Sequence, residues 1–173
     1  MDPTLPNGSV FKLVDVTGEA DLDGARQLFR AYADEFADLL FETLRFQGFD
    51  AEIAGLPGRY APPSGCLLLA RHGDRAAGCV GLRDLGDGTC EMKRLYVEPA
   101  YRCQDLGKLL VEAVLHRARS NGYRRMVLDT RPEMTGALAL YRAFGFVEIP
   151  AYWDNIIERT VYLEKILNTS NLH

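Results

Sequence analysis

The sequence contains no apolar run long enough to cross a bilayer and no stretch rich in basic residues. A membrane-spanning helix needs about 20 consecutive apolar residues, so we expect no membrane partner. The 173 residues carry a net charge of -4, whereas proteins that bind nucleic acid usually present a basic stripe. We therefore expect no nucleic-acid partner, and an anionic ligand would need a local positive site.

Cysteine is also scarce, and no two cysteines form a CxxC pair. Three of the four lie in apolar stretches, which is typical of free thiols that pack as small hydrophobic side chains. No cluster of His and Cys has the spacing of a metal site, so we expect no metal. The opening residues, "MDPTLPNGSV", have neither the basic nor the apolar region of a leader, so we expect a cytoplasmic protein in a reducing environment. The cysteines are Cys66, Cys79, Cys90 and Cys103.

Hydrophobic residues, in contrast, are abundant and make up 47% of the chain. At this length the chain can bury one substantial core, and it is too short for two ordinary domains. No repeat, low-complexity tract or linker divides it. We therefore predict one domain that covers residues 1–173.

The first half of the sequence predicts a strand, two helices and then three strands. Residues 10–16 are apolar and rich in β-branched side chains, and an apolar stripe at three- and four-residue intervals indicates a helix that begins near Asp21 or Asp23. A second helix is expected over Leu39–Phe46, followed by a loop rich in Pro and Gly over Gly55–Gly65. Gly-Asp turns separate the next three strands, the pattern of an antiparallel meander. These strands are Cys66–His72, Ala76–Arg83 and Cys90–Val97.

The second half changes to alternating helices and strands. Apolar residues from Leu106 onward share one helical face, and Gly122 ends that helix. The sequence "TRPE" (Thr130–Glu133) resembles a capping box that opens another helix, which continues through Tyr141. Three more strands are expected in this half: Arg124–Thr130, Phe146–Pro150 and Thr160–Ile166.

These elements predict an α/β fold with the order βααβββαβαββ. The central sheet is mixed and has about seven strands, flanked by about four helices. Its N-terminal strands form the antiparallel meander, and the strands before and after the helix at Leu106 should run parallel to each other.

The loop "VEPAYRCQDLGK" (Val97–Lys108) connects a strand to a helix. Such a connection gathers unpaired backbone N–H groups and the positive end of a helix at one point, which suits an anion such as phosphate. On this spacing alone an ordinary strand-to-helix turn explains the loop better, because such turns are common and the glycines here are sparse.

The stretches "CEMKRLYVEPAYRCQDLGKLLVEAV" and "ALALYRAFGFVEI" together resemble the GNAT superfamily of N-acetyltransferases, whose cofactor loop reads (R/Q)xxGx(G/A) after a strand of the form ExKRLYV. The resemblance covers most of the chain and is strongest over Glu91–Val114 and Ala137–Phe146. It implies the GNAT fold, in which the parallel strands splay around the cofactor. It also implies acetyl-CoA as the donor co-substrate, a primary amine as the acceptor, and direct transfer without an acyl-enzyme.

The resemblance assigns cofactor contacts to one strand and to the loop after it. Backbone groups of Leu95 and Val97 would meet the thioester carbonyl and the pantetheine arm, and the Leu95 N–H would stabilise the oxyanion. Arg102 and Gly107 fill the first and last positions of the loop motif, whose N–H groups would hold the pyrophosphate. The residues implied to contact acetyl-CoA are Leu95, Tyr96, Val97, Arg102, Cys103, Gln104, Asp105, Leu106, Gly107, Lys108 and Met134.

Three positions depart from the family pattern. Cys103 and Asp105 stand where the family often has glycine, and Met134 stands where it often has asparagine. A carboxylate 4 Å from a phosphate costs about 1 kcal/mol in water and about 4 kcal/mol at an effective dielectric of 20. Because Arg102 and Lys108 add positive charge nearby, we expect the Asp105 carboxylate to turn outward and cofactor binding to survive, although weakened.

The resemblance also implies two catalytic side chains. Glu91 would accept the proton of the acceptor ammonium, directly or through water, and strand alternation would put it on the same face as Val97. The alternative for Glu91 is a solvated glutamate on an edge strand. Tyr141 matches the family's "LYxxxGF", and its hydroxyl would protonate the leaving thiolate or hold its sulfur. The alternative for Tyr141 is an aromatic residue of the core.

Two segments, expected to be loops beside the thioester end of the cofactor, should select the acceptor: Arg45–Asp50 and Ala151–Asn155. Asp50 or Asp154 could hold an ammonium group, with aromatic residues of the second segment beside it, and both acids could equally be solvated turn residues. The acceptor is either a small-molecule amine or a peptide. A longer acyl group and a homodimer stay open.

The rival interpretation is a catalytically inactive binding or regulatory module of the GNAT fold. In that interpretation Asp105 and Met134 mark a lost cofactor site.

Overall fold

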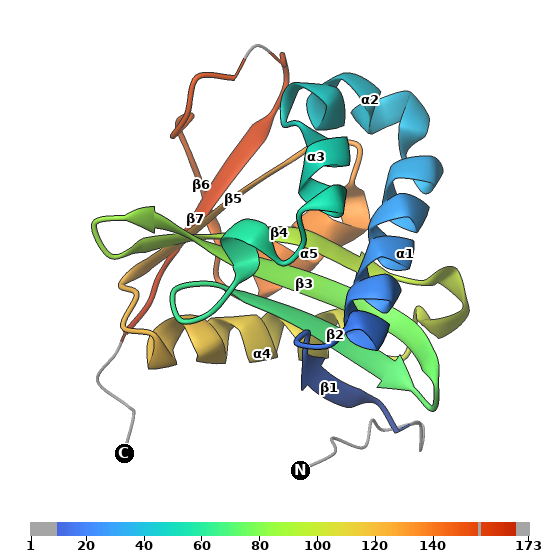
Figure 1. Cartoon of the computed structure of the whole chain (residues 1–173). Coiled ribbons are helices and arrows are strands. Elements are labelled where there is room, and N and C mark those ends of the chain that lie inside the picture. Colours follow the sequence, from blue (N-terminus) through green and yellow to red (C-terminus); the bar gives the residue numbers. More distant parts are fainter. Residues whose placement is uncertain (1–9, 156, 169–173) are drawn as a thin grey trace.

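The computed structural model describes residues 10–155 and 157–168. A seven-stranded sheet runs through the molecule with helices on both of its faces (Figure 1). Residues 1–9, in which we expect no leader, lie outside the described part.

The strands follow the order β1-β2-β3-β4-β5-β7-β6 across the sheet. Every neighbouring pair is antiparallel except β4 and β5, which run parallel. The predicted meander and the predicted parallel pair are therefore confirmed. The strands are β1 Lys12–Asp15, β2 Cys66–His72, β3 Arg75–Gly86, β4 Thr89–Val97, β5 Arg125–Thr130, β6 Val147–Ile149 and β7 Val161–Ile166.

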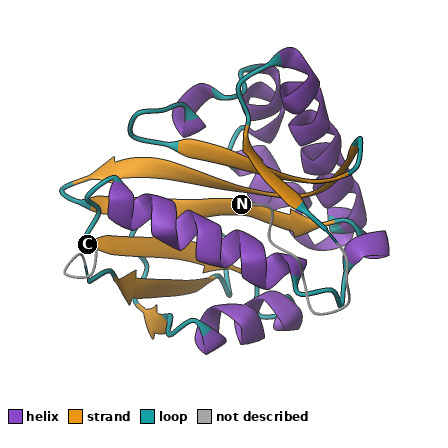
Figure 2. Ribbon diagram, turned by 90° about the horizontal axis from the view of Figure 1, so that it is seen from below, coloured by secondary structure: helices purple, strands orange, loops and turns teal. Residues whose placement is uncertain are grey.

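Five α-helices and two short 3-10 helices connect the strands within the described residues. Helices α1, α2 and α3 cover one face of the sheet (Figure 1). Helix α4 crosses the other face and runs in front of the strands when the molecule is seen from below (Figure 2). The helices are α1 Glu19–Glu35, α2 Ala37–Phe46, α3 Phe49–Ala54, α4 Leu106–Ser120 and α5 Thr135–Ala143, and the 3-10 helices are Gly58–Tyr60 and Pro99–Tyr101.

The hydrophobic core has two halves, one on each face of the sheet. Strand β2 serves both, because successive side chains of a strand point to opposite faces. Leu69 packs in the half beneath α1 with Leu28 and Phe29, whereas Leu68 packs in the half beneath α4 with Leu110. The continuous apolar run of β2 therefore reflects burial on both faces rather than a helix.

Glycine provides backbone conformations that other residues adopt only with strain. Gly86 (φ 86°) lies in the turn between β3 and β4, and Gly122 (φ 83°) lies just after α4. Both are in the left-handed region, where a Cβ atom is unfavourable. The predicted hairpin turn and the predicted end of the helix are confirmed at these positions.

Helix α1 begins at Glu19, close to the predicted start near Asp21. The prediction for a later segment was wrong. The segment Arg45–Asp50, expected to be a loop, contains the end of α2 and the start of α3, with Gly48 between them at φ 70°. Sequence periodicity missed α3 because its six residues are too few to show an apolar stripe.

The predicted capping box at Thr130–Glu133 is also wrong. Thr130 is the last residue of β5 and pairs with Val161 of β7, so its backbone is extended. Its hydroxyl donates to Met134 Sδ at 3.6 Å. Helix α5 begins at Thr135, and no side chain caps its N-terminus.

Candidate active site

A cleft opens where the two parallel strands separate. Strands β4 and β5 pair at three positions, the last of which joins Glu91 to Val127. Beyond that position the two strands do not pair with each other in the described structure. Leu95, Tyr96 and Val97 follow on β4 and line the cleft, which has a volume of about 560 Å³. This is within the range of about 300 to 1,000 Å³ that holds small molecules and cofactors.

A bulge in β4 determines which side chains reach the cleft. Tyr96 pairs with Cys79 and Lys93 pairs with Gly81, so two residues of β4 stand opposite one residue of β3. Arg94, inside this bulge, has a left-handed backbone with φ 58°. The extra residue reverses the alternation of side chains beyond it.

The bulge overturns the predicted shared face of Glu91 and Val97. Glu91 pairs across the sheet with Arg83, which lines a hollow on the side of α2 and α3. Val97 packs with the core half beneath α4. Strand periodicity failed here because it assumes that no extra residue interrupts the strand.

The predicted phosphate-binding loop lies along the same cleft and ends in a helix. Cys103 (φ 60°) and Asp105 (φ 59°) both have left-handed backbones. The first backbone bond of α4 runs from the Leu109 N–H to the Asp105 carbonyl at 3.0 Å, so the N–H groups of the residues between them have no acceptor within the helix. Cys103 and Asp105, which stand where the family often has glycine, therefore both adopt a backbone conformation that glycine favours.

Arg102 is held by a carboxylate that is distant in the sequence. Its two terminal nitrogens donate to the two oxygens of Glu35, each at 2.7 Å, and its Nε donates to the Val97 carbonyl at 2.9 Å. These hydrogen bonds keep the pKa of Glu35 below its ordinary value, although burial opposes this. Arg102 therefore braces the loop against α1, and much of its charge is matched by Glu35.

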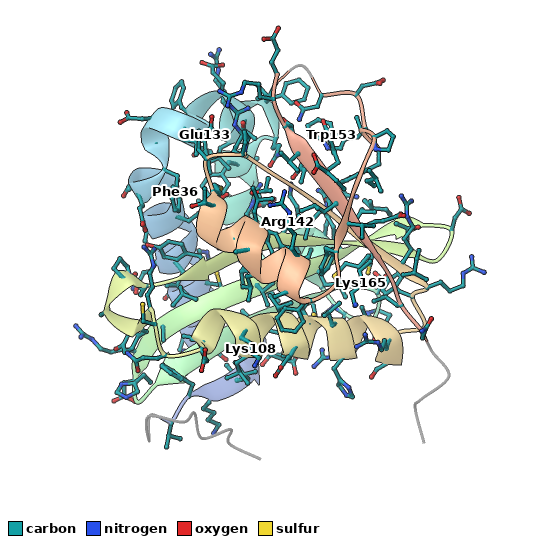
Figure 3. All side chains as sticks on the ribbon, turned by 180° about the vertical axis from the view of Figure 1, so that it is seen from behind. Phe36, Lys108, Glu133, Arg142, Trp153 and Lys165 are labelled. Carbon is teal, nitrogen blue, oxygen red and sulfur yellow. The ribbon has the colours of Figure 1, made fainter. Side chains whose placement is uncertain are left out.

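The rim of the cleft is formed by three separate elements. Phe36 lies between α1 and α2, Glu133 lies just before α5, and Lys108 extends from α4 (Figure 3). Lys108 is exposed, and among the described residues no ion pair involves it. Its charge thus remains available at the predicted phosphate end of the cleft.

A second, polar cavity of about 60 Å³ adjoins the cleft. Leu95, Met134 and Ala137 line both spaces. Residues from both faces of the sheet reach this cavity, because it lies where β4 and β5 have separated. The polar side chains on its wall are Tyr32, Thr43, Gln47, Lys93, Arg94, Asp129, Thr130, Arg131, Tyr141 and Thr160.

Lys93 and Asp129 form the charged centre of the cavity wall. Lys93 Nζ lies 3.7 Å from Asp129 Oδ1 and donates to Gln47 Oε1 at 3.2 Å. Burial lowers the pKa of Lys93 below its ordinary value, which Asp129 partly opposes. Trp153 Nε1 donates to the other oxygen of Asp129 at 3.0 Å. Both side chains are thus held in place on the wall of the polar cavity.

Tyr141, predicted as a catalytic residue, lies on the wall of the same cavity. It is 8% exposed, and its ring packs edge-on against Phe146. Burial raises the pKa of Tyr141 well above its ordinary value, so its hydroxyl keeps its proton and is able to donate a hydrogen bond to a ligand. Burial also raises the pKa of Tyr32, across the cavity, to about 12.

Glu91, the predicted base, lies outside the described cavities. It is 1% exposed, which rules out a solvated edge-strand glutamate. Arg83 Nε donates to Oε1 and the Tyr152 hydroxyl donates to Oε2, both at 2.6 Å. Burial raises the pKa of a carboxyl group, but the charges of Lys93 and Arg83 and the Tyr152 hydrogen bond outweigh it and lower the pKa of Glu91.

The two segments expected to select the acceptor lie in different environments in the structure. Tyr152 and Trp153 reach the sheet through their hydrogen bonds to Glu91 and Asp129, and Trp153 stacks on Phe46. Trp153 is visible above the C-terminal strands in Figure 3. Asp50 lies instead beside a separate hollow between α1 and α3 and lines neither the cleft nor the polar cavity. Asp154 is exposed.

The sequence interpretation missed most of the polar cavity. Two signals pointed to it. Lys93 is a charged residue inside a strand whose neighbours are buried, and Asp129 lies near the carboxyl end of a buried parallel strand, where α/β sheets commonly bind ligands. Thr43 and Arg131 gave no signal. They lie on α2 and just after β5, and they line the same cavity only because these distant segments pack together.

Two features are absent from the part of the chain that the structure describes. No helix there has the length and apolar character needed to span a membrane. No group of three or more His, Cys, Asp or Glu side chains in that part could hold a metal ion.

Comparison with known families and sequences gives a consistent result. A model of the acetyltransferase (GNAT) family matches residues 25–146. An uncharacterized N-acetyltransferase of Schizosaccharomyces pombe is 42% identical over 146 residues, a match that covers 83% of this chain and 86% of the relative.

Solved structures share this fold, and one of them contains acetyl-CoA. An acetyltransferase of Streptococcus agalactiae superposes with a TM-score of 0.76 at 21% identity, over 91% of this chain and 98% of that chain. A GNAT family acetyltransferase of Elizabethkingia anophelis, solved with acetyl-CoA bound, is 29% identical with a TM-score of 0.52, over 60% of this chain and 77% of that chain.

Proposed function

The chain belongs to the GNAT family of acetyltransferases, and we propose that it transfers the acetyl group of acetyl-CoA directly to a primary amine. The observation that carries this proposal is the junction of two spaces at Leu95. The larger space has the volume and loop of a cofactor site, and the smaller one is lined by polar side chains that suit an acceptor. An acyl group that reaches the junction would meet the acceptor there.

The chemistry of the larger cleft fits an acyl-CoA. A left-handed residue such as Asp105 before a right-handed helix gives the backbone arrangement that binds anions through successive N–H groups. The free N–H groups of the first turn of α4 and the helix dipole favour a pyrophosphate at the same point. Lys108 adds a charge at the rim. The acetyl-CoA in the structure from Elizabethkingia anophelis supports this assignment.

Leu95 is the proposed donor to the thioester oxygen. Neither β3 nor β5 pairs with it in the described structure, which favours a backbone N–H directed at a ligand. When the amine nitrogen attacks, the carbonyl oxygen gains negative charge, and one such donor is worth about 2.7 to 4 kcal/mol in the transition state.

Asp129 is the proposed proton acceptor. Of the described residues that line the polar cavity, Asp129 alone carries a carboxylate, so an acceptor ammonium would meet it directly. The ammonium proton passes to this carboxylate, and the free amine attacks the thioester carbonyl. The C–S bond breaks as the amide bond forms, and the second proton lost from nitrogen neutralises the departing thiolate to give the CoA thiol. Glu91, whose oxygens are occupied by Arg83 and Tyr152, is proposed instead to position Tyr152.

Tyr141 is proposed to hold the leaving sulfur. The raised pKa of its hydroxyl makes full transfer of its proton to a thiolate, whose conjugate acid has a pKa near 8.5, unfavourable. A hydrogen bond from that hydroxyl nevertheless stabilises the negative charge on sulfur. Of the two roles open for Tyr141, the structure thus favours holding the sulfur over protonating it.

Calorimetric titration with acetyl-CoA separates this proposal from an inactive module. Binding in the micromolar range, with release of free CoA when an amine is added, supports the transferase. No heat at millimolar acetyl-CoA would favour a module that has lost its cofactor site.

A further inference from the structure

Two residues on the wall of the polar cavity each have a buried polar atom without a hydrogen-bond partner in the described structure. Thr43 Oγ1 and Arg131 Nε are both buried and make no hydrogen bond within the described structure. Among the described residues, no other buried side-chain nitrogen or oxygen lacks a hydrogen-bond partner. Both residues line the cavity, so a ligand there could complete their hydrogen bonds. Unpaired buried polar groups are rare in folded proteins and call for such an explanation.

One edge of the Arg131 guanidinium group makes no hydrogen bond within the described structure. Its Nη1 donates to the Glu158 carbonyl at 2.5 Å, which fixes the group from the other side. Among the described residues, no hydrogen bond involves Nε or Nη2. These two nitrogens form the fork that binds both oxygens of a carboxylate.

The carboxylate nearest to Arg131 is a weak partner. Glu133 Oε2 lies 3.7 Å from Arg131 Nε, beyond hydrogen-bond distance. The other oxygen of Glu133 pairs with Arg159 at 3.2 Å, and Glu133 lies on the rim of the adjoining cleft. The charge of Arg131, whose side chain is 14% exposed, is therefore incompletely matched.

The charges of the cavity wall favour an anion. Its cationic side chains are Lys93, Arg94 and Arg131. Arg94 is matched by Glu52, which accepts from its Nε at 2.7 Å. Lys93 lies 3.7 Å from Asp129, the single carboxylate among the lining residues, whereas Arg131 lies 3.7 Å from Glu133. Among the lining residues themselves, positive side chains thus outnumber negative ones, and the carboxylate beside Arg131 belongs to Glu133, outside that set.

We propose that the acceptor is an amine that also carries a carboxylate, as a free α-amino acid does, and that Arg131 and Thr43 hold this carboxylate. The inference rests on the proposed acetyl transfer and adds the class of its substrate. Asp129 receives the ammonium end, and Arg131, two residues further along the chain, receives the carboxylate. A small cavity of this kind admits the amino and carboxyl groups and leaves the side chain of the acceptor outside.

Other amines suit the cavity less well. A polyamine would bring additional positive charge to a wall that already has an excess of it. A lysine side chain or the amino terminus of a protein has no carboxylate beside its nitrogen, and Arg131 Nε and Thr43 Oγ1 would stay unpaired.

The test compares matched amines in acetyl transfer from acetyl-CoA. A panel of α-amino acids is assayed beside the amines that lack only the carboxyl group, such as phenylalanine with phenethylamine and lysine with cadaverine. We expect kcat/KM for the preferred amino acid to exceed that of its decarboxylated partner by about 10- to 100-fold, because two charge-assisted hydrogen bonds are lost. Arg131→Met should remove most of this preference, mainly through KM, whereas Arg131→Lys should keep part of it.

Arg75→Met is the matched control. Arg75 is exposed at the start of β3 and lines none of the described cavities, so the preference should not change. Decarboxylated amines that react as well as the amino acids in the wild-type protein would overturn the inference and leave acetyl transfer intact. If no amine of the panel is acetylated although acetyl-CoA binds, the proposed function itself fails, and the assignment of the acceptor fails with it.

Discussion

The Tyr152 hydroxyl donates a 2.6 Å hydrogen bond to Glu91 Oε2, which joins the C-terminal loop to the middle of β4. Arg83 occupies the other oxygen at the same distance. The carboxylate that the family pattern indicates as the base is thus part of a buried ion pair. Its removal should therefore affect the stability of the fold more than the chemistry.

Glu91→Gln should lower the free energy of unfolding by about 3 kcal/mol near neutral pH, because the Arg83 charge is left buried without its partner. The pKa of Glu91 is lowered in the folded protein, so its stabilisation is present above the unfolded pKa and is lost as the pH falls through the folded pKa. Urea unfolding from pH 7 down to pH 3 measures this. Glu148→Gln, at an exposed position of β6, serves as the control and should change little. Equal stability of Glu91→Gln and wild type at pH 7 would contradict the buried ion pair.

Asp129→Asn should lower kcat/KM for the acceptor by about 10²- to 10⁴-fold, the usual contribution of a positioned base. Its affinity for acetyl-CoA should stay the same, since Asp129 lines the polar cavity and not the larger cleft. Glu91→Gln, assayed where it is folded, should lose less than about tenfold. Steady-state kinetics on both variants decides between the two acids. A larger loss in Glu91→Gln than in Asp129→Asn would restore Glu91 as the base.

Tyr141→Phe should lower kcat by about 10- to 100-fold, because a hydrogen bond to a charged atom is lost in the transition state. Its melting temperature should barely move, since the ring keeps its packing and the described structure records no hydrogen bond from its hydroxyl. Tyr123→Phe offers the opposite signature. Its hydroxyl donates to the Ser64 carbonyl at 2.7 Å, so that variant should melt earlier with unchanged kcat. A drop in the melting temperature of Tyr141→Phe that parallels its loss of kcat would indicate a structural hydroxyl.

Asp105→Gly should bind acetyl-CoA more tightly by about 1 kcal/mol at low salt, because an exposed carboxylate near the pyrophosphate is removed. The gain should shrink at high salt, where exposed charges are screened. Cys103→Gly is a close control, since Cys103 has nearly the same φ without a charge. In both variants glycine relieves the left-handed strain and adds freedom to the unfolded chain, two effects of about 1 kcal/mol that largely cancel. Weaker acetyl-CoA binding by Asp105→Gly at both salt concentrations would mean that the carboxylate belongs to the site.

Local signals in the sequence predicted most of the fold. The alternation and turns of residues 66–97 define three antiparallel strands by themselves, and the change to helical periodicity at Leu106 indicates the parallel crossover. The loop motif likewise indicated the residues from Arg102 to Lys108, all of which line the cleft except Gln104. These features depend on neighbours within a few residues, which the sequence shows directly.

The candidate site depends on contacts between distant residues, and these were not predictable. Nothing in the residue type of Arg94 indicates its left-handed backbone, yet this bulge changes the face to which β4 side chains point. The pairing of Arg102 with Glu35 joins positions 67 residues apart. Asp129 meets Lys93 only because the strands that carry them adjoin and then separate.

The most direct test of the account is a product analysis with acetyl-CoA carrying a labelled acetyl group. The protein is incubated with this donor and a panel of amines, and free CoA thiol and the masses of the amines are followed together. We expect at least one amine to gain a labelled acetyl group on nitrogen, in equal amount to the thiol released, and Asp129→Asn to slow this reaction greatly. Tight binding of acetyl-CoA without any labelled amine, across amino acids, simple amines and peptides, would contradict it.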